Sequence, residues 1–531
     1  RRVPMRQRSR GGVDVGLLDE QQQAALESAL RGESLFISGG AGSGKSFTLL
    51  RIIDALRDRH GGDFGDRVAV SASTGRAALL IGGTTLHDVA GCGVPYYKSD
   101  FKKMSGKKDM WTKLEVLIID EISMVSGEFL DYLDSELRNI RNSDAPFGGL
   151  QLIFSGDPFQ IPPIHQTFKN LQGLHPDELL NNNMLALDYN GRIRYLFTNR
   201  GMFFHSQAYW ELAVKVVELG TPHRQGDDAD FVRHLSSIRG EAEGTDCREA
   251  IDYFNTRVFD AVEAGSDDTL IMLPTIAQVR GLNDGKLDEL QSDSMVFEAK
   301  DNVTVEYDLD GNPGIWRLYT ENPCHTLRSS AFFDEEHSDC KVVKHLELKV
   351  GARVMLAANL RTQHSKLVTG AIGTVTRLPP PGEKGDWAEV DFEGAGSQMI
   401  LPRSFSATVP GWGMCFREQL PLQLAWAITH HRSQGMTLSR VRVDPYAFVD
   451  GLLYVALSRI RRIDGLHLMS PIDPDSIKVN PDAVIFAKHH KDPPRAQQLL
   501  GTWRDQPLPD ECWERLMPEQ ESEELEPEDP A

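Results

Sequence analysis

Residues 39–46 read GGAGSGKS, and this spacing of glycines, a lysine and a hydroxyl is typical of a loop that binds nucleotide phosphates. Glycines allow successive backbone N–H groups to curl around phosphate oxygens at the first turn of a helix. Lys45 would hold the β- and γ-phosphates, and the Ser46 hydroxyl would ligate magnesium. A glycine-rich turn without function would match this pattern by chance in about one chain of this length in fifty. The sequence therefore predicts a site for ATP and Mg²⁺, formed by Gly40, Ala41, Gly42, Ser43, Gly44, Lys45, Ser46 and Phe47.

Two further groups of polar residues follow apolar runs and could complete a hydrolysis site. In VLIIDE, Asp120 can hold the magnesium shell and Glu121 can orient the attacking water. A later run, LQLIF, ends in SGDPFQIPP, which places Asp157 and Gln160 at the edge where open α/β sheets bind ligands. Acids after a strand are often only a solvated strand end, but this alternative weakens beside a phosphate loop. Gln160 could sense the γ-phosphate, although at this point it could equally be a polar loop residue.

The elements that position these residues follow from the pattern of apolar runs. From Leu35 to Phe154 such runs alternate with helical patterns, as in parallel strands joined by crossover helices. This region is predicted to be a doubly wound α/β domain. A second α/β unit is predicted to begin at Ala213–Leu219 and to resume at residue 415, after an insert of β-type runs over residues 291–414. The helix after the phosphate loop is predicted to lie on the first sheet through Phe47, Leu49, Leu50, Ile52, Ile53 and Leu56.

The charge of the chain is uneven. The 531 residues carry a net charge of -20, but residues 510–531 hold ten acids and one arginine, so this tail contributes -9 and the remainder -11. The tail is predicted to be disordered. The segment Lys98–Lys113 has six lysines against two aspartates, interleaved with Phe101 and Trp111, and could lie along a phosphate backbone. A solvated loop is the alternative, and it is favoured by about three to one when the segment is read alone.

Several classes of protein are disfavoured by what the sequence lacks. No apolar stretch approaches the length of a membrane span, and RRVPMRQRSRGG at the N-terminus has no apolar core of a secretory signal. Six cysteines are scattered without a CxxC pair, so neither a zinc site nor a disulfide framework is indicated. We expect a soluble intracellular protein, nuclear or mitochondrial in a eukaryote and cytoplasmic in a bacterium, with more than one domain.

These residues, with several others, resemble the Pif-type (petite integration frequency) DNA helicases, which are 5′-to-3′ motors of helicase superfamily 1. The resemblance begins at LDEQQQAAL, continues through the phosphate loop to ASTGRAALLIGGTTLH, and is most specific in EFLDYLDSELRNIRNSDAPFGGLQLIFSGD. It implies that Gln22 reads adenine. It also implies that the residues contacting DNA in the first half are Thr74, Gly75, His87 and Pro162.

The second half of the chain resembles the same family. ELGTPHRQ and LLYVALSRIRRIDGL place Arg224 and Arg459 where the family has arginines that face the γ-phosphate and stabilise developing charge. Without the resemblance, each arginine would be a surface salt-bridge partner by about four to one. PLQLAWAITHHRSQGMTL resembles the segment that couples the phosphate site to DNA. In that segment Gly435 is assigned to ATP, the DNA contacts are His431, Arg432 and Ser433, and Arg432 stands where the family usually has lysine.

The resemblance also implies a domain division. Residues 17–212 would form a first RecA-like domain with a wedge insert at about residues 91–114, and residues 213–290 and 415–485 a second. Residues 291–414 would contain an SH3-like β-barrel. Residues 1–16 would be a disordered basic N-terminus, and residues 486–531 a C-terminal extension with the acidic tail. The fold class expected is thus α/β, with two RecA-like parallel-sheet domains and two inserts.

The predicted function is an ATP-dependent 5′-to-3′ DNA helicase that moves on single-stranded DNA and opens forked duplexes, hybrids or folded DNA. The resemblance implies a role in replication, repair, recombination or telomere upkeep. We expect a monomer, with a protein partner for the acidic tail. A translocase that strips bound protein without unwinding would have identical motor residues. A non-enzymatic scaffold should have lost some of them, and a plain P-loop kinase or GTPase leaves the second half unexplained.

Overall fold

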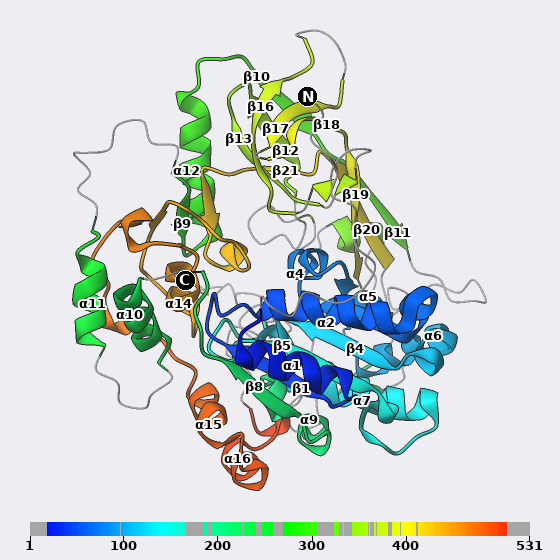
Figure 1. The fold of residues 1–531 in the computed structure, drawn as a ribbon. Coiled ribbons are helices and arrows are strands. Elements are labelled where there is room, and N and C mark those ends of the chain that lie inside the picture. The colour runs from blue at the N-terminus through cyan, green and yellow to red at the C-terminus, as the bar shows by residue number, and fades with distance from the viewer. Residues whose placement is uncertain are drawn as a thin grey trace, which may run out of the picture.

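The computed structural model describes residues 18–506 except residues 96, 166–184, 188–192, 225–227, 241–246, 259–268, 306–322, 329–332, 334–341, 359, 362–365, 368, 381–384, 393 and 410–412 (Figure 1). The predicted basic N-terminus and the acidic tail lie outside the described residues. Two parallel sheets and a group of antiparallel strands organise the rest.

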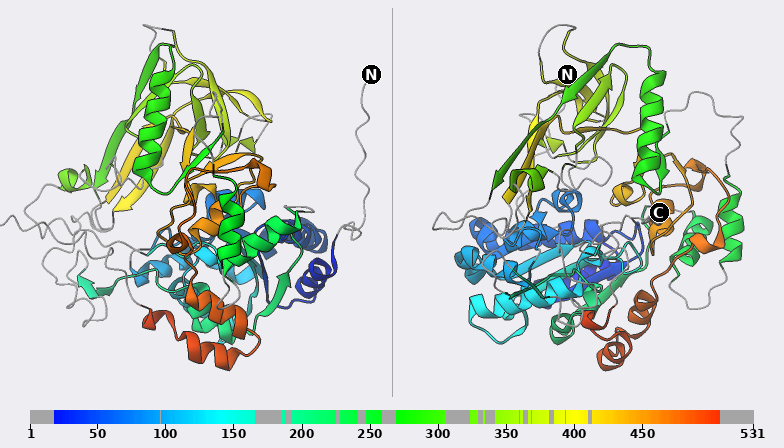
Figure 2. Two further views of the ribbon diagram at one scale, coloured as in Figure 1. Left: turned by 90° about the vertical axis from the view of Figure 1, so that its left-hand side faces the viewer. Right: turned by 180° about the vertical axis from the view of Figure 1, so that it is seen from behind.

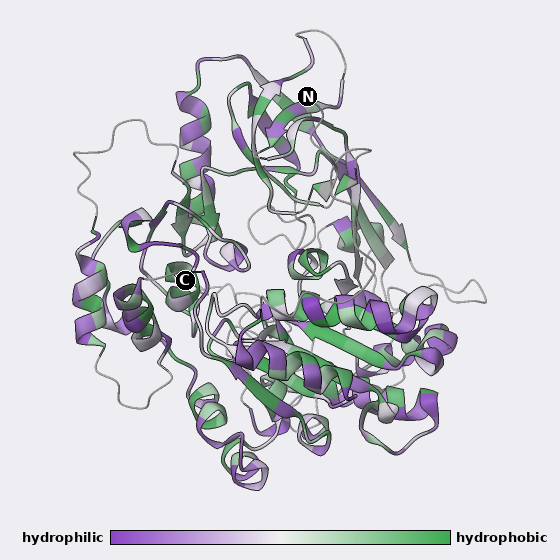
Figure 3. Cartoon of the chain, viewed as in Figure 1, coloured by the Kyte–Doolittle hydropathy of each residue, from purple (hydrophilic) through white to green (hydrophobic). Residues whose placement is uncertain are grey.

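Six parallel strands form the first sheet, in the order β3-β2-β4-β5-β1-β8. Its central strands are apolar along their length, as Figure 3 shows for β4, because helices cover both faces. Along β1, Leu35 and Ile37 pack on one face and Phe36 on the other, since successive side chains of a strand point to opposite faces. The strands are β1 (Leu35–Gly39), β2 (Val68–Ala72), β3 (Thr84–Thr85), β4 (Val116–Asp120), β5 (Gln151–Gly156) and β8 (Lys215–Leu219).

Helices α1 (Glu20–Leu30) and α2 (Lys45–His60) cover one face of this sheet. The apolar face predicted for α2 is only partly right. Leu49, Ile52, Ile53 and Leu56 are buried, but Leu50 is 37% exposed and Phe47 is half-buried. Successive helical residues point about 100° apart, so Leu50 turns away from the sheet that Leu49 contacts.

The opposite face is covered by helices that lie far apart in the sequence. They include α7 (Gly127–Arg141), α9 (Gln207–Glu211), α15 (Pro481–His489) and α16 (Pro493–Leu500). Phe486 of α15 stacks on Phe204 at 4.8 Å and meets Phe36 of β1 at 6.2 Å. In both views of Figure 2 these last helices lie against the first sheet, far from the antiparallel strands. The prediction that residues up to 485 belong to the second domain is therefore wrong for α15.

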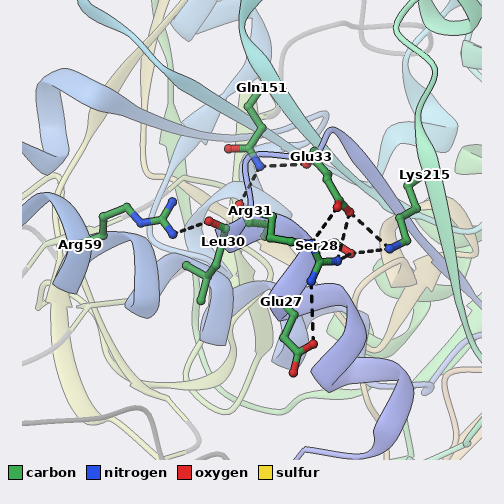
Figure 4. Close-up of polar contacts among 9 residues, drawn as sticks. Glu27, Ser28, Leu30, Arg31, Glu33, Arg59, Gln151 and Lys215 are labelled. Atoms are coloured by element: carbon green, nitrogen blue, oxygen red, sulfur yellow. Dashed lines mark hydrogen bonds and ion pairs between the residues drawn. The ribbon is translucent and has the colours of Figure 1, made fainter.

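The strand predicted to open the second domain also belongs to the first sheet. β8 pairs in parallel with β1, with Leu35 beside Lys215 and Gly39 beside Leu219. Lys215 Nζ donates to Ser28 Oγ over 2.9 Å and forms an ion pair with Glu33 at 3.3 Å (Figure 4). These contacts fix β8 beside the connection between α1 and β1. An edge strand that is half exposed has the same alternating pattern in either sheet, so the pattern could not assign it.

The second parallel sheet has four strands in the order β22-β9-β23-β24. With the first sheet, it confirms the predicted α/β class with two parallel sheets. The strands are β9 (Ile271–Leu273), β22 (Ala427–Thr429), β23 (Val441–Val443) and β24 (Leu466–Leu468), and the helices of this half are α10 (Ala229–Arg239), α11 (Arg248–Asn255), α12 (Ile276–Glu289) and α14 (Leu452–Leu457).

Antiparallel strands fill the predicted insert. Five of them form one sheet in the order β18-β17-β16-β13-β21, and β11-β20-β19 and β10-β12 pair beside it. The insert is longer than predicted, because β20 and β21 continue it past residue 414. Its SH3-like character stays a prediction. The bounds are β10 (Ser294–Glu298), β11 (Lys300–Val305), β12 (His345–Lys349), β13 (Arg353–Leu356), β16 (Ile372–Arg377), β17 (Ala388–Phe392), β18 (Gly396–Ile400), β19 (Arg403–Val409), β20 (Gly413–Gln419) and β21 (Leu422–Leu424).

The lysine-rich segment does not present its aromatic residues to a ligand. It forms a 3-10 helix (Lys98–Lys107) and α6 (Lys108–Lys113), and both Phe101 and Trp111 are fully buried in the core of the first domain. Lys98 Nζ lies 5.4–5.6 Å from three aromatic rings, those of Tyr132, Tyr195 and Trp503. The idea that these aromatics interleave with a nucleic acid is therefore wrong. The wedge role of the segment stays a prediction.

Smaller predictions can also be compared with the structure. Strands β6 (Leu185–Leu187) and β7 (Ile193–Tyr195) pair antiparallel. Cys92, Cys247, Cys324 and Cys415 are free thiols. Within the part of the chain that the structure describes, no helix is both long and apolar enough to cross a membrane.

The packing of α15 leads to a first prediction. Replacing Phe486 with alanine removes a 2%-exposed ring from the core of the first domain, so we expect the free energy of unfolding to fall by about 3–5 kcal/mol. Urea denaturation measures this. Leu499→Ala, which truncates a 40%-exposed side chain of the neighbouring helix, should change the free energy by about 0.5 kcal/mol or less. Equal effects of the two changes would mean that α15 is not part of this core.

Candidate active site

The phosphate-type loop connects β1 to α2 at the carboxyl edge of the first sheet. Gly42 and Gly44 have φ of +86° and +87°, a conformation that disfavours residues with a Cβ. Lys45 begins α2, and its Nζ donates to the carbonyls of Gly39 over 2.7 Å and Gly40 over 2.9 Å. Burial lowers the Lys45 pKa. The loop thus brings its predicted residues to one place, with Ser46 exposed and Phe47 beneath the Arg51 guanidinium.

Two acids lie at the carboxyl end of β4, which is separated from β1 by β5 in the sheet. Asp120 is 4% exposed, and burial, reinforced by the negative charge of Glu121, raises its pKa to about 7. Glu121 adopts a left-handed conformation with φ of 53°. Such strain is retained where a side chain must be aimed at a site. Glu121 Oε2 is buried and has no hydrogen-bond partner among the described residues, so it is free to orient another group.

The donors around the loop fit Mg²⁺. A hydroxyl at Ser46 and a carboxylate at Asp120 are hard oxygen ligands, which this ion prefers. Among the described residues, no group of three or more His, Cys, Asp and Glu side chains could enclose a metal ion. Mg²⁺ is commonly held by one or two protein oxygens together with phosphate oxygens and water, and this arrangement suits the site.

Residues after β5 connect the two halves of the molecule. Asp157 is fully buried, and Gln160, which is 4% exposed, donates to it over 3.4 Å. Gln434, from the segment after β22, in turn donates to Gln160 Oε1 over 3.4 Å. The predicted sensor glutamine therefore lies in the junction between the two parallel sheets.

The two predicted arginines come together, but from different places than expected. Arg224 follows β8 of the first sheet, and its Nη1 donates to the Ser458 carbonyl over 3.0 Å. Arg459 is 2% exposed and donates to the Val455 carbonyl over 2.8 Å and to Ser458 Oγ over 2.7 Å. Burial, with the positive charge of Arg224 beside it, lowers the Arg459 pKa to about 10. The assignment of Arg224 to the second domain is therefore wrong, since the chain reaches it from the first sheet.

Gln22, predicted to read adenine, is buried at the N-terminus of α1. Its side-chain oxygen accepts the Asp19 N–H over 3.2 Å, and its amide nitrogen lies 3.2 Å from His223 Nε2. The backbone N–H of His223 donates to the Gly42 carbonyl over 2.8 Å. His223 was not among the predicted site residues. Its only signal in the sequence is its place next to Arg224.

Three of the predicted DNA contacts of the first half follow neighbouring strands of the first sheet: Thr74 and Gly75 follow β2, and His87 follows β3. Thr74 caps α4 (Gly75–Leu80) and accepts the Ala77 N–H over 3.2 Å, so its hydroxyl already has a structural partner. His87, in α5 (Leu86–Ala90), packs edge-on against Phe129 at 5.0 Å. A groove of about 390 Å³ runs between Gly75 and the insert strands β14 (Leu360–Arg361), β15 (Lys366–Leu367) and β19.

The predicted contacts of the second half are less uniform. Arg432 is exposed, whereas His431 is half-buried, as is Pro162 of the first half. Ser433 is fully buried and its hydroxyl donates to the His430 carbonyl over 2.6 Å, so this conformation does not present it to a ligand. Gly435, assigned to ATP, has φ of +75°, and a Cβ there would lie 3.9 Å from Arg76 of α4.

The chain is similar in sequence to known helicases. The sequence profile described as "PIF1-like helicase" matches residues 17–178. ATP-dependent DNA helicase PIF1 of Danio rerio is 33% identical over 478 residues, which cover 89% of this chain and 64% of that protein. The chain thus spans less than two thirds of the length of this relative.

Two solved structures extend the similarity to the fold. The crystal structure of Pif1 helicase from Candida albicans aligns with a TM-score of 0.68 and 27% identity, covering 90% of this chain and 99% of that one. Pif1 helicase from Bacteroides, in complex with ADP-AlF3 and ssDNA, aligns with a TM-score of 0.61 and 26% identity over 91% of this chain and 98% of that one.

A second prediction tests the phosphate-type loop without touching its lysine. Gly44 has φ of +87°, and a Cβ there would lie 2.6 Å from Gln22 Nε2 and 3.1 Å from the His223 ring. The left-handed conformation alone costs an alanine about 1–2 kcal/mol. Gly44→Ala should therefore weaken binding of a fluorescent ATP analogue about tenfold or more.

Gly62→Ala is the matched control, because a Cβ at Gly62 has no atom within 4 Å. Its affinity for the analogue should equal that of the unchanged chain. If Gly44→Ala also bound the analogue with unchanged affinity, the loop would not be the nucleotide site.

Proposed function

We propose that the chain, which is similar to PIF1-like helicases, is an ATP-dependent DNA helicase that moves along single-stranded DNA and separates forked duplexes. One observation carries the proposal. Glu121 of the first sheet lies within electrostatic reach of Lys45 in the phosphate-type loop and also of Arg459, which follows α14 of the second half and lies beside Arg224. A nucleotide held there would contact both halves at once.

The roles of the individual residues follow from their chemistry. Lys45 would bind the β- and γ-phosphates, and Ser46 with Asp120 would hold Mg²⁺. Mg²⁺, when bound, would neutralise charge on the phosphates. Glu121, with an unpartnered buried oxygen, would orient the attacking water. Arg224 and Arg459 would stabilise the charge that develops on the transferred phosphoryl oxygens.

Gln160 would report the γ-phosphate to the second half. It lies between Asp157 and Gln434, so a displacement of its side chain acts on both sheets. ATP binding would draw the sheets together and hydrolysis would release them, while each half grips the strand in turn. We assign the grip to Thr74, Gly75, His87 and Pro162 in the first half and to His431 and Arg432 in the second, and not to Ser433, because its hydroxyl is buried and bonded to the His430 carbonyl.

The substrate is proposed to be single-stranded DNA, bound mainly through its backbone. Backbone contacts carry little base information, so broad sequence tolerance is expected. A related structure contains ssDNA with ADP-AlF3, and another concerns forked dsDNA and two coordinating Pif1 helicases. We propose 5′-to-3′ movement from the family, and action on one DNA strand by a single copy of this chain. Such a motor would work where DNA lies, in a nucleus, a mitochondrion or a bacterial cytoplasm.

A third prediction tests the proposed activity directly. With ATP and Mg²⁺, the chain should separate a duplex that carries a 5′ single-stranded tail and leave a 3′-tailed duplex closed. Glu121→Gln keeps the size of the side chain but removes the charge that orients water, so strand separation and ATP hydrolysis should fall by a factor of about 100 or more.

Glu115→Gln is the control, because Glu115 precedes the same strand at its far end and its side chain forms an exposed ion pair with Arg67. Its activity should be unchanged. Hydrolysis that depends on DNA while neither duplex opens would replace unwinding with translocation as the function. Opening of the 3′-tailed duplex alone would reverse the proposed polarity.

A further inference from the structure

A buried ion pair joins the two halves directly behind the phosphate-type loop. Arg239, at the end of α10, is 6% exposed, and its Nη2 lies 3.0 Å from Oδ1 of the fully buried Asp157. The guanidinium group also lies 4.5 Å from the centre of the Phe159 ring. Burial opposes ionisation of Asp157, but the positive charges of Arg239 and Lys45 outweigh it and hold the pKa of this carboxyl below its usual value.

Tyr454 connects this ion pair to the loop itself. Its hydroxyl donates to Asp157 Oδ2 over 3.0 Å and accepts the backbone N–H of Ala41 over 2.7 Å. A hydroxyl has a single proton, so donating it to the carboxylate leaves the lone pairs for the amide. The result is a continuous series of contacts from Arg239 through Asp157 and Tyr454 to Ala41, almost entirely shielded from water.

Tyr454 is also tied to Arg459. Tyr454 belongs to α14, Arg459 lies in the turn that directly follows this helix, and Arg459 Nε donates to the Val455 carbonyl over 2.8 Å. Because a helical turn moves as a unit, a movement that shifts the Arg459 guanidinium must also shift the Tyr454 hydroxyl. A cavity of about 130 Å³ borders Gly40, Ala41, Arg239 and Tyr454, and it leaves space for such a displacement.

We propose that Tyr454, held by Asp157 and Arg239, is a positioning residue that couples the conformation of the phosphate loop to the separation of the two parallel sheets. The inference rests on the proposed function, because it assigns these residues a part in the same cycle of hydrolysis. When the halves approach, Tyr454 fixes the Ala41 amide at the moment when Arg459 reaches the nucleotide. When they separate, the loop loses that support.

Tyr454→Phe in the full chain tests the proposal, since the ring and its packing remain while both hydrogen bonds are lost. We expect kcat for DNA-stimulated ATP hydrolysis to fall about tenfold, with KM for ATP changed less than about twofold. The melting temperature should fall by no more than about 4 °C, because Asp157 loses one hydrogen bond but keeps Arg239 and the Phe159 N–H as partners. Tyr253→Phe removes a hydroxyl from α11, where the ring stacks on His234, and should leave kcat unchanged.

A second variant separates coupling from simple loss of a contact. Asp157→Asn keeps the size of the side chain but removes the acceptor charge that orients Tyr454. If the two residues act through one series of contacts, adding Tyr454→Phe to Asp157→Asn should lower kcat by less than about threefold instead of tenfold. A full tenfold additional loss would mean that Tyr454 acts independently of Asp157 and would overturn the proposal.

Other results would also refute the positioning role of Tyr454 or the proposed function. An unchanged kcat in Tyr454→Phe would refute the positioning role, and so would a fall in melting temperature large enough to explain the lost activity. A wild-type chain that binds the ATP analogue but shows no hydrolysis with single-stranded DNA would refute the proposed function. The failure of the function and the failure of the positioning role are thus told apart by the wild-type measurement.

Discussion

A carboxylate taken out of water between two domains is stable only when a cation and hydrogen-bond donors come with it. Asp157 receives the guanidinium of Arg239 from α10, the hydroxyl of Tyr454 from α14 and the backbone N–H of Phe159. Two of these three partners belong to the second half of the molecule. The two halves are therefore held at a point next to the phosphate-type loop. The contact made through Gln160 and Gln434 is longer, at 3.4 Å, and is easier to break.

The charges around this point explain why nucleotide binding should favour closure. Burial raises the Asp120 pKa to about 7 and lowers that of Arg459 to about 10, so the charged form of each group is penalised. A nucleotide phosphate would compensate Arg459 and Lys45, and a bound Mg²⁺ would compensate Asp120. Binding of the nucleotide and of Mg²⁺ therefore offsets the free-energy cost of burying these charged groups. This links ligand binding to the approach of the two halves.

Local chemistry could be read from the sequence with little ambiguity. The loop that contains Lys45 and the strand that ends at Asp120 depend on glycine conformation, strand burial and fixed spacing, and all three are properties of a few neighbouring residues. Contacts across hundreds of residues could not be read in this way. Arg239 resembles an ordinary core residue until the fold brings it to the loop, and the only sequence signal of Tyr454 and His223 is that each lies near a predicted arginine.

Side-chain direction was the other limit. Phe101 and Trp111 stand among lysines, a composition that fits a nucleic-acid surface, yet both rings turn into the core. Long lysine side chains reach solvent from the same backbone that buries its aromatic neighbours. Composition reports which groups are present in a segment. It does not report which way they point, and that direction decides whether an aromatic ring can stack on a base.

The position of β8 in the first sheet also determines where Arg224 lies. Because Leu219 pairs beside Gly39, the chain leaves β8 next to the phosphate-type loop. The backbone N–H groups of His223 and Arg224 then both donate to the Gly42 carbonyl. Arg224 is thus fixed to the loop before the second half contributes anything, and its guanidinium reaches across to Ser458. Only Arg459 depends on the approach of the second half, so of the two arginines it is the one that can make hydrolysis conditional on closure.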